Sequence, residues 1–572
     1  MNRRFVWTVA GLGFAVGLGV ARADTLTWTG MTGDWAAVEN WTNAASPEAT
    51  RVPAAGDDAV ISQAGAYVAL TNASAFLGSL TLSDASLVMS NWDTLLSATN
   101  VTIASGGVLT CEGPFTNNAV SNRVNLLCSN LLVETGGTID VSGKGWAGGL
   151  TLVLNAYQKG NGPGARGYYY GASYGGAGRN GQSPGYLTPT NTYGVAEAPL
   201  DPGSGGHAGN NIGSMGGSGG GAVRIVADSV VVSGIIRANG SATIPSSHCS
   251  AGSGGGIFVT CTTIAGTNGV IEANAGDPLI GHLGGGGGGG RVAVIYNPAE
   301  QAVLPVPAIR FSAASSMSGG QYTRLPGDIG TLYFPDSLFF SATNLFTGQW
   351  LAPGLSTNIA LSEWTVSNVW TRLPGMSITV TNALKIVGTN SLLARLDLTN
   401  ASSVACDELT LDGATLVVGR MIYEYGTRDF NPLPPDSEGS TLDCAGDLVL
   451  ANQARLYVYA DLTHPELASD YGARVSAGGD VSLGSNCWIY PVAHPTNGAS
   501  VLFTMQNLTI TNAGGFNANT FGFAGGTPWG YPETFSNRAY GPGAPGFSHG
   551  AGYGGWGSTG YLGTAAGQPY GS

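Results

Sequence analysis

Charged side chains are scarce in this sequence. Asp, Glu, Lys and Arg make up 10% of the 572 residues, and the 35 acidic residues outnumber the 22 basic ones, which gives a net charge of -13. Nucleic acid is excluded as a partner, because its phosphates require a basic face. Hydrophobic residues nevertheless reach 43%, enough for a folded core rather than a disordered chain. We therefore expect a surface built from Ser, Thr, Asn and Gly.

Long apolar runs are also missing after residue 20. The one such run, Phe5–Val20, follows a basic start at Arg3 and Arg4 and precedes Ala21-Arg22-Ala23, a small-x-small cleavage pattern. This order predicts a signal peptide over residues 1–23 and secretion to the extracellular space or cell surface, with a retained anchor as the alternative. No second run follows, so we expect no integral membrane span in the mature chain.

Cysteine is sparse, and its pattern points to no cofactor. The seven cysteines are odd in number and widely spaced, which argues against a zinc site or a dense disulfide framework. The glycine tracts lack the aspartates of calcium-binding nonapeptide repeats. We expect no metal and no cofactor, and most cysteines as small buried hydrophobes.

Sustained helical periodicity is absent, whereas alternation with a period of two recurs. Examples are Leu80–Leu82, Val101–Ile103, Leu409–Leu411 and Leu448–Leu450, each followed by a turn and a second short run. In mid-chain, three glycine triplets start 35 and then 34 residues apart (at Gly219, Gly254 and Gly288), and each leads into a β-rich run. This pattern predicts an all-β parallel β-helix with glycine-rich inserts, of about 20 coils and roughly 100 Å. Tandem β-sandwiches are the alternative.

The glycine tracts, including the seven consecutive glycines Gly284–Gly290, permit two interpretations. Flexible linkers are one. The tracts are in phase with the strands, however, which favours ordered, closely packed turns.

The chain is duplicated on a larger scale. Residues 161–181 match residues 540–560 at 12 of 21 positions. We therefore expect an N-terminal cap over 24–75, a first β-helix module over 76–297, a connecting segment over 298–375 and a second module over 376–572. The second copy stops before its strand-bearing glycine units, so we expect the gene product to continue beyond Ser572; a natural end with its own cap is the alternative.

The start of the mature chain resembles a known class of protein. Its pattern is Leu26–Gly30, Gly33-Asp34-Trp35, Asn40-Trp41, Val52-Pro53 and Gly56-Asp57-Asp58. It is similar to the opening of large exported bacterial β-solenoid proteins related to autotransporter passengers and adhesins, as are the glycine-rich units. The resemblance implies a β-helix at the cell surface and carries over no catalytic residue.

Two patterns in the sequence resemble catalytic sites. A β-helix enzyme acting on polysaccharide, a lyase or hydrolase, sets several ionisable groups from adjacent coils toward one groove. The most ion-rich stretch, residues 420–480, is where such a site is expected, although a solvated insertion fits it as well. His248-Cys249 is the other pattern; neighbouring side chains point to opposite sides of a strand and no orienting third group is evident. We therefore assign no catalytic residue.

Aromatic side chains set among glycines are the remaining candidates for binding. Such rings can stack on the apolar faces of sugars, or pack on the glycine backbone and close the core. The candidate ligand-binding residues are Trp146, Tyr168, Tyr169, Tyr170, Tyr174, Tyr553 and Trp556. The sequence thus predicts a non-enzymatic structural or adhesive surface protein whose partners are extracellular polysaccharide or cell-envelope components; a β-helix carbohydrate-active enzyme is the alternative.

Overall fold

The structure is a computed structural model of the whole chain. It describes residues 23–43, 45–47, 50–116, 120–154, 158–167, 169–181, 191–243, 248–320, 326–340, 346–353, 358–399, 403–419, 439–494, 497–519 and 522–523.

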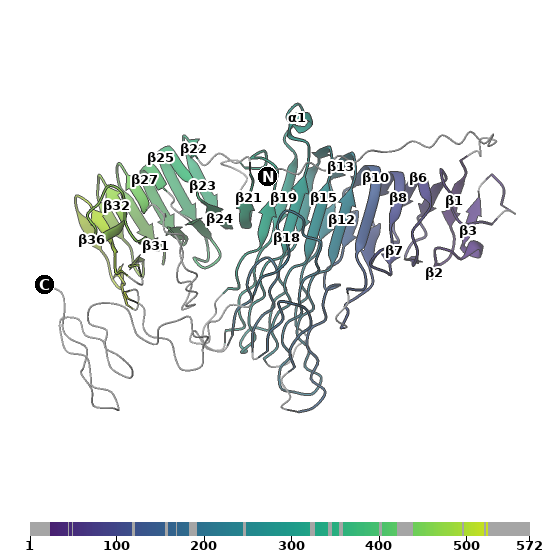
Figure 1. Cartoon of the computed structure of the whole chain (residues 1–572), viewed down its shortest axis with the longest axis horizontal. Helices are drawn as coiled ribbons and strands as arrows, with labels where there is room; N and C mark the ends of the chain where they lie inside the picture. Colours follow the sequence, from purple (N-terminus) through teal and green to yellow (C-terminus); the bar gives the residue numbers. More distant parts are fainter. Residues whose placement is uncertain are drawn as a thin grey trace, which may run out of the picture.

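The predicted parallel β-helix is confirmed, and it forms one continuous rod (Figure 1). Three sheets make its walls. Sheet 1 runs the whole length and contains β1 (Thr25–Trp28), β3 (Trp41–Asn43), β4 (Asp58–Ile61), β6 (Phe76–Leu82), β8 (Leu96–Ile103), β10 (Val124–Val133), β12 (Ala222–Val226), β13 (Ser229–Val232), β15 (Gly256–Thr260), β16 (Thr263–Ala265), β18 (Arg291–Ile295), β20 (Thr331–Tyr333), β21 (Gly348–Leu351), β24 (Trp370–Pro374), β26 (Arg395–Thr399), β28 (Thr415–Val418), β31 (Arg455–Tyr459), β34 (Trp488–Val492) and β37 (Gly515–Phe516).

The other two sheets each line part of the rod. Sheet 2 faces the first part and contains β2 (Thr32–Asp34), β5 (Tyr67–Leu70), β7 (Ser86–Met89), β9 (Val108–Cys111), β11 (Thr138–Asp140), β14 (Ile235–Arg237), β17 (Thr267–Glu272) and β19 (Ala308–Ser312). Sheet 3 faces the second part and contains β22 (Asn358–Leu361), β23 (Trp364–Ser367), β25 (Ser377–Val387), β27 (Ser403–Asp412), β29 (Ser440–Cys444), β30 (Leu448–Ala451), β32 (Tyr471–Ala477), β33 (Val481–Leu483), β35 (Ser500–Thr504) and β36 (Leu508–Ile510). Among the described residues, helix is confined to the single turns η1 (Val38–Asn40) and α1 (Pro298–Gln301).

Sixteen strands of sheet 1 stack in parallel from β1 to β37. Fifteen steps of about 4.8 Å give a described rod of roughly 70 Å, shorter than the expected 100 Å. The alternation seen in the sequence is the reason for the stack. Inward positions such as Leu396, Leu416 and Leu456 are in register and fully buried, so each coil covers the apolar side chains of the last.

The first coil is closed by three tryptophans of the opening motif. Trp41 lies between Trp28 and Trp35, at ring centroid distances of 5.2 and 4.8 Å, and all three are buried. β1 pairs antiparallel with β3 on one edge and parallel with β4 on the other. The hairpin therefore covers the ladder edge that the first coil would otherwise expose.

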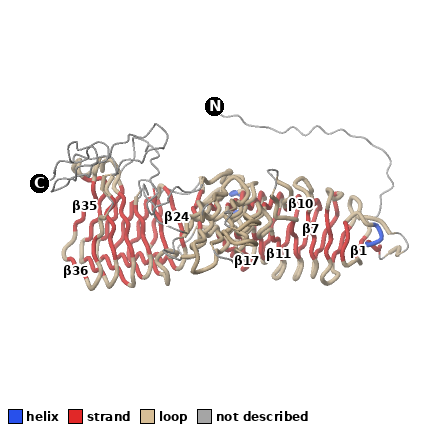
Figure 2. Tube along the Cα trace, turned by 90° about the horizontal axis from the view of Figure 1, so that it is seen from below, coloured by secondary structure: helices blue, strands red, loops and turns tan. Residues whose placement is uncertain are grey.

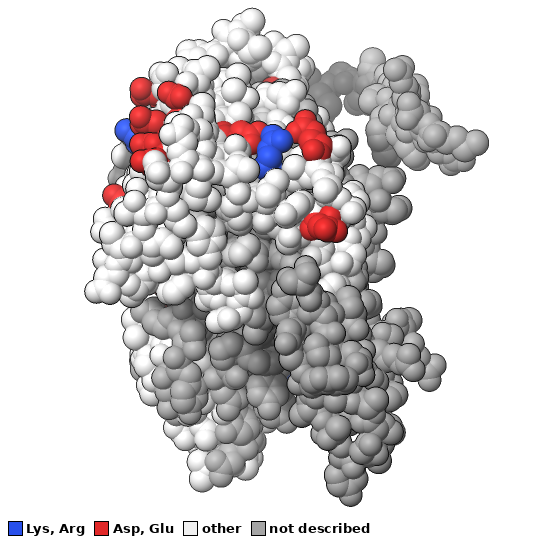
Figure 3. All heavy atoms as spheres, turned by 90° about the vertical axis from the view of Figure 1, so that its left-hand side faces the viewer, with Lys and Arg blue, Asp and Glu red and all other residues white. Residues whose placement is uncertain are grey.

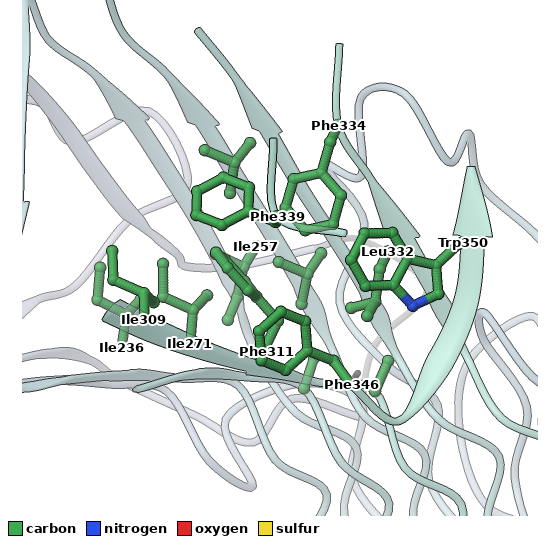
Figure 4. Close-up of a cluster of buried hydrophobic side chains, with 14 of the residues drawn as sticks. Ile236, Ile257, Ile271, Ile309, Phe311, Leu332, Phe334, Phe339, Phe346 and Trp350 are labelled. Carbon is green, nitrogen blue, oxygen red and sulfur yellow. The ribbon is translucent and has the colours of Figure 1, made fainter. Parts of the chain in front are cut away.

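Residues 298–375, expected as a connecting segment, add coils to the same stack. β19 pairs with β17, and β20, β21 and β24 continue sheet 1. Aromatic rings fill the interior here, where sheet 2 ends and sheet 3 begins (Figure 4). Phe334 lies 5.0 Å from Phe311 and 5.2 Å from Trp350, measured between ring centroids.

The two parts of the rod use sheet 1 differently. In the first part its strands are the long ones, such as β10, and the short strand that follows, β11, lies in sheet 2. In the second part the long strand β27 lies in sheet 3, and the short strand that follows, β28, lies in sheet 1. Sheet 1 therefore changes from the long-strand wall to the short-strand wall at the junction.

The glycine-rich segments form a side arm that projects from the rod (Figures 1 and 2). We define the glycine arm as the described residues of segments 141–221, 238–255, 273–290 and 313–330, each of which follows a strand of sheet 2 and precedes the next strand of sheet 1. Hydrogen bonds between them recur every three residues: the amides of Gly217 and Gly220 donate to the carbonyls of Ser250 and Ser253, both at 3.0 Å. Ala251 and Gly254 donate in the same way to Gly285 and Gly288.

Three residues per turn is the repeat of a polyproline II thread. Gly284–Gly290 accordingly have negative φ angles. The prediction of ordered, closely packed glycine is confirmed, but the tracts are extended threads rather than turns. They require glycine because a Cβ on Gly288 would lie 2.0 Å from the carbonyl oxygen of Gly176, and one on Gly219 would lie 2.0 Å from that of Gly203.

Candidate binding face on sheet 1

The aromatic residues predicted to bind ligand lie inside the glycine arm. Trp146, Tyr169, Tyr170 and Tyr174 are all buried, with exposed fractions of 8% or less. Tyr168, Tyr553 and Trp556 lie outside the described residues. Burial of the four described rings favours the packing alternative over stacking on an external ligand.

Each buried ring has a defined partner. Trp146 packs on Phe115 with 4.7 Å between ring centroids, and the guanidinium of Arg166 lies 4.5 Å above Tyr170. Tyr174 lies 4.8 Å from Tyr193, and burial raises its pKa well above the ordinary value. These residues hold the threads together, because large rings fill the space that glycine leaves.

The side chains of His248 and Cys249 also pack within the glycine arm. The His248 ring lies 5.6 Å from Tyr169 and 5.9 Å from His282. The Cys249 sulfur accepts a hydrogen bond from the Gly209 amide at 3.2 Å. The two side chains thus contact different threads and do not form a nucleophile pair.

The ion-rich stretch 420–480 does not converge on a groove within the part that the structure describes. Arg474 donates to Asp443 and to Glu466, both at 2.7 Å, and the Glu466 side chain is mostly exposed. Residues 420–438 lie outside the described chain. The described ion pairs are ordinary surface contacts between neighbouring coils.

A different set of functional side chains lies on the outer face of sheet 1 in the second part of the rod. Strands β24, β26, β28, β31 and β34 are in register, so their outward residues form rows across the coils. We call this set the sheet 1 ladder; it comprises Trp370, Arg372, Arg395, Asp397, Arg455, Tyr457, Trp488 and Tyr490.

One end of the ladder is a buried ionic cluster. Asp397 is fully buried and accepts hydrogen bonds from the Trp370 indole at 2.8 Å and from Arg372 at 3.3 Å, and it also pairs with Arg395. Arg372 in turn makes two bonds to Asp328, at 2.8 and 3.1 Å. The two carboxylates and two guanidiniums come from neighbouring coils, and each carboxylate is bonded to a guanidinium.

The other end of the ladder is aromatic. The rings of Tyr457 and Tyr490 stack with 4.3 Å between centroids and 7° between planes. Both are half-buried, as are Arg455 and Trp488, the register pair two positions earlier on the same strands. Beside them on the same face, Val417, Tyr459 and Val492 form a small apolar cluster separate from the core, and Tyr457 packs against it.

Comparison with known protein families, with curated proteins and with solved structures finds no match for this chain. The site is therefore assigned from its geometry. Sequence reasoning missed the ladder because it followed glycine-rich aromatics and acidic density. The available signal was alternation: in Arg455–Tyr457 and Trp488–Tyr490, aromatic or charged residues flank an aliphatic one at equivalent positions of successive coils.

The described residues contain neither a metal-binding cluster nor a membrane-spanning helix. No group of three or more His, Cys, Asp or Glu among the described residues is arranged to hold a metal ion. None of the described helices has the length and apolar character to cross a bilayer. Figure 3 looks at the C-terminal end of the rod and shows that few of the visible side chains are charged.

Proposed function

We propose that this chain is an exported structural or adhesive protein of the cell surface or extracellular matrix, which binds polysaccharide along the sheet 1 ladder without catalysing a reaction on it. The signal-peptide pattern of residues 1–23 and the resemblance to exported β-solenoid proteins support the location. The side chains of the sheet 1 ladder support polysaccharide as the class of ligand.

The observation that carries the proposal is the stacked pair Tyr457 and Tyr490 beside Trp488 on a regular sheet. Aromatic faces bind the apolar faces of sugar rings. Outward positions repeat at each coil, about every 4.8 Å, so an extended polymer can meet the side chains of successive coils one after another. Arg455 is in register with Trp488 and adds a guanidinium to this part of the ladder.

Binding is favoured over catalysis because the carboxylates of the ionic cluster are already hydrogen-bonded. Four ionisable groups converge from neighbouring coils, which is the number that an enzyme site would need. However, both Asp397 oxygens already accept hydrogen bonds, and both Asp328 oxygens bond Arg372. Within the described residues, the cluster offers no carboxylate left over to act as a general acid or base.

A glycan array probed with the mature chain, residues 24–572, tests the proposal. Replacing Tyr457 and Tyr490 with Ala is expected to weaken binding to the recognised glycan about tenfold, because each stacking contact contributes roughly 0.5–1.5 kcal/mol. The matched control is Tyr67→Ala on sheet 2, where the ring is 38% exposed. Binding to no glycan, or equal loss in the control, contradicts the proposal. New reducing ends after incubation would favour the enzyme instead.

A further inference from the structure

Two of the seven cysteines face each other across neighbouring coils. In the pairing of β27 with β29, Cys406 and Cys444 are direct partners, and both side chains point inward in line with Val404 and Leu442. Their exposed fractions are 6% and 4%, and the Cys444 thiol donates to the carbonyl oxygens of Asp407 and Asp447, both at 3.1 Å. No other two cysteines are direct strand partners in the described pairings, although all seven are buried.

We infer that Cys406 and Cys444 form a disulfide that joins the coil of β27 to the coil of β29 when the protein folds in an oxidising environment. Neighbouring parallel strands lie about 4.8 Å apart, which falls within the Cα separation of roughly 4.4–6.8 Å that a disulfide spans. The two residues are already direct register partners on neighbouring strands, so little backbone movement is needed. The inference rests on the proposed export, because exported proteins meet such conditions and cytosolic ones rarely do.

The oxidant is a low-molecular-weight disulfide such as oxidised glutathione. The thiolate of one cysteine attacks a sulfur of the oxidant, breaking its S–S bond and releasing one glutathione thiol. The second protein thiolate then attacks the mixed disulfide, forming the protein S–S bond and releasing the second glutathione thiol. The two protons of the cysteines end on the two glutathione molecules. Both sulfurs are covered in the folded rod, so the reaction belongs to the folding phase, before the next coil buries them.

The bond has a structural consequence. It closes the chain between residues 406 and 444, a segment that includes residues 420–438. A cut anywhere in this segment would then leave the two parts of the rod covalently joined.

Refolding the reduced mature chain with reduced and oxidised glutathione tests the bond without depending on export. After denaturation without reductant, we expect five free thiols instead of seven. Trypsin should yield peptides 396–420 and 429–455 as one linked species that separates on reduction. Seven free thiols, or a linkage between other cysteines, would overturn the inference.

Two variants complete the design. Cys406→Ser should leave six thiols and no linked species, whereas Cys487→Ser, a buried cysteine in the second part of the rod, should leave four thiols and an intact linkage. If Cys406→Ser does not fold, the tryptic peptides of the unaltered chain still show whether Cys406 and Cys444 are linked. Failure to be exported in cells would count against the proposed function and leave this result unchanged.

Discussion

At the scale of single residues, burial rather than chemical identity decides what the histidines and aromatic rings do. His207 lies within the glycine arm, fully buried, and its Nδ1 accepts a hydrogen bond from the Tyr169 amide at 3.4 Å. Burial lowers the pKa of His207 to about 4. Since the charged form is disfavoured in the folded state, the neutral ring is the one that supports the arm.

This lowered pKa predicts a loss of stability in mild acid. The unfolded chain takes up a proton near pH 6.5 and the folded chain only near pH 4, so stability is complete above pH 6.5 and falls as the pH drops toward 4, by about 3 kcal/mol for this residue. Thermal melts of the mature chain between pH 7 and pH 4.5 measure the loss.

A variant of His207 distinguishes its contribution to this loss of stability from the contributions of other titratable groups. Burial also lowers the pKa of His248 and of His464, which act in the same direction. Asp57 and Asp140 have lowered pKa values, so their contributions disappear only below the usual carboxylate range. His207→Gln should therefore show a smaller fall than the unaltered chain; an equal fall in both would contradict the assignment.

At the scale of elements, the glycine arm depends on contacts between backbones rather than between side chains. The amide of Gly288 donates to Ala172, its carbonyl accepts from Gly254, and its Cα faces Gly176. Each thread has no internal hydrogen bonds and is stable only beside its neighbours. One added methyl group should therefore disturb several threads together.

Gly288→Ala is accordingly expected to destabilise the arm, by about 1–3 kcal/mol or more, because the new Cβ would lie 2.0 Å from a backbone oxygen. Gly167→Ala is the control, since its Cβ would meet nothing within 4 Å and its φ is negative. Hydrogen exchange measured by mass spectrometry should show faster exchange over 250–256 and 284–290 in the first variant alone. Rapid exchange of these peptides in the unaltered chain would contradict the ordered arm.

At the scale of the whole molecule, the rod determines shape. A compact globule of 572 residues would have a radius of gyration of about 25 Å. Small-angle scattering of the mature chain should give a clearly larger value and an asymmetric distance distribution, together with a mainly β circular dichroism spectrum. A compact, symmetric particle would contradict the continuous stack.

The coil architecture could be predicted from the sequence because its cause is local. Alternation in Leu409–Leu411 and Leu448–Leu450 places one face of each strand inward, and a short coil can bury that face only against the next coil. The phase between glycine tracts and strands likewise indicated ordered glycine, since a flexible linker needs no fixed spacing.

Only the tertiary structure decided which side chains remain accessible and which groups meet. Tyr170 and Tyr457 are both tyrosines, yet one is buried in the glycine arm and the other is half-buried on the outer face of sheet 1. The cluster of Asp328, Arg372 and Asp397 unites three coils, and the partnership of Cys406 with Cys444 depends on register. The sequence by itself determined the repeating coil, because period and turn chemistry act over a few residues. The site depended on the stacking of coils, which brings together residues dozens of positions apart.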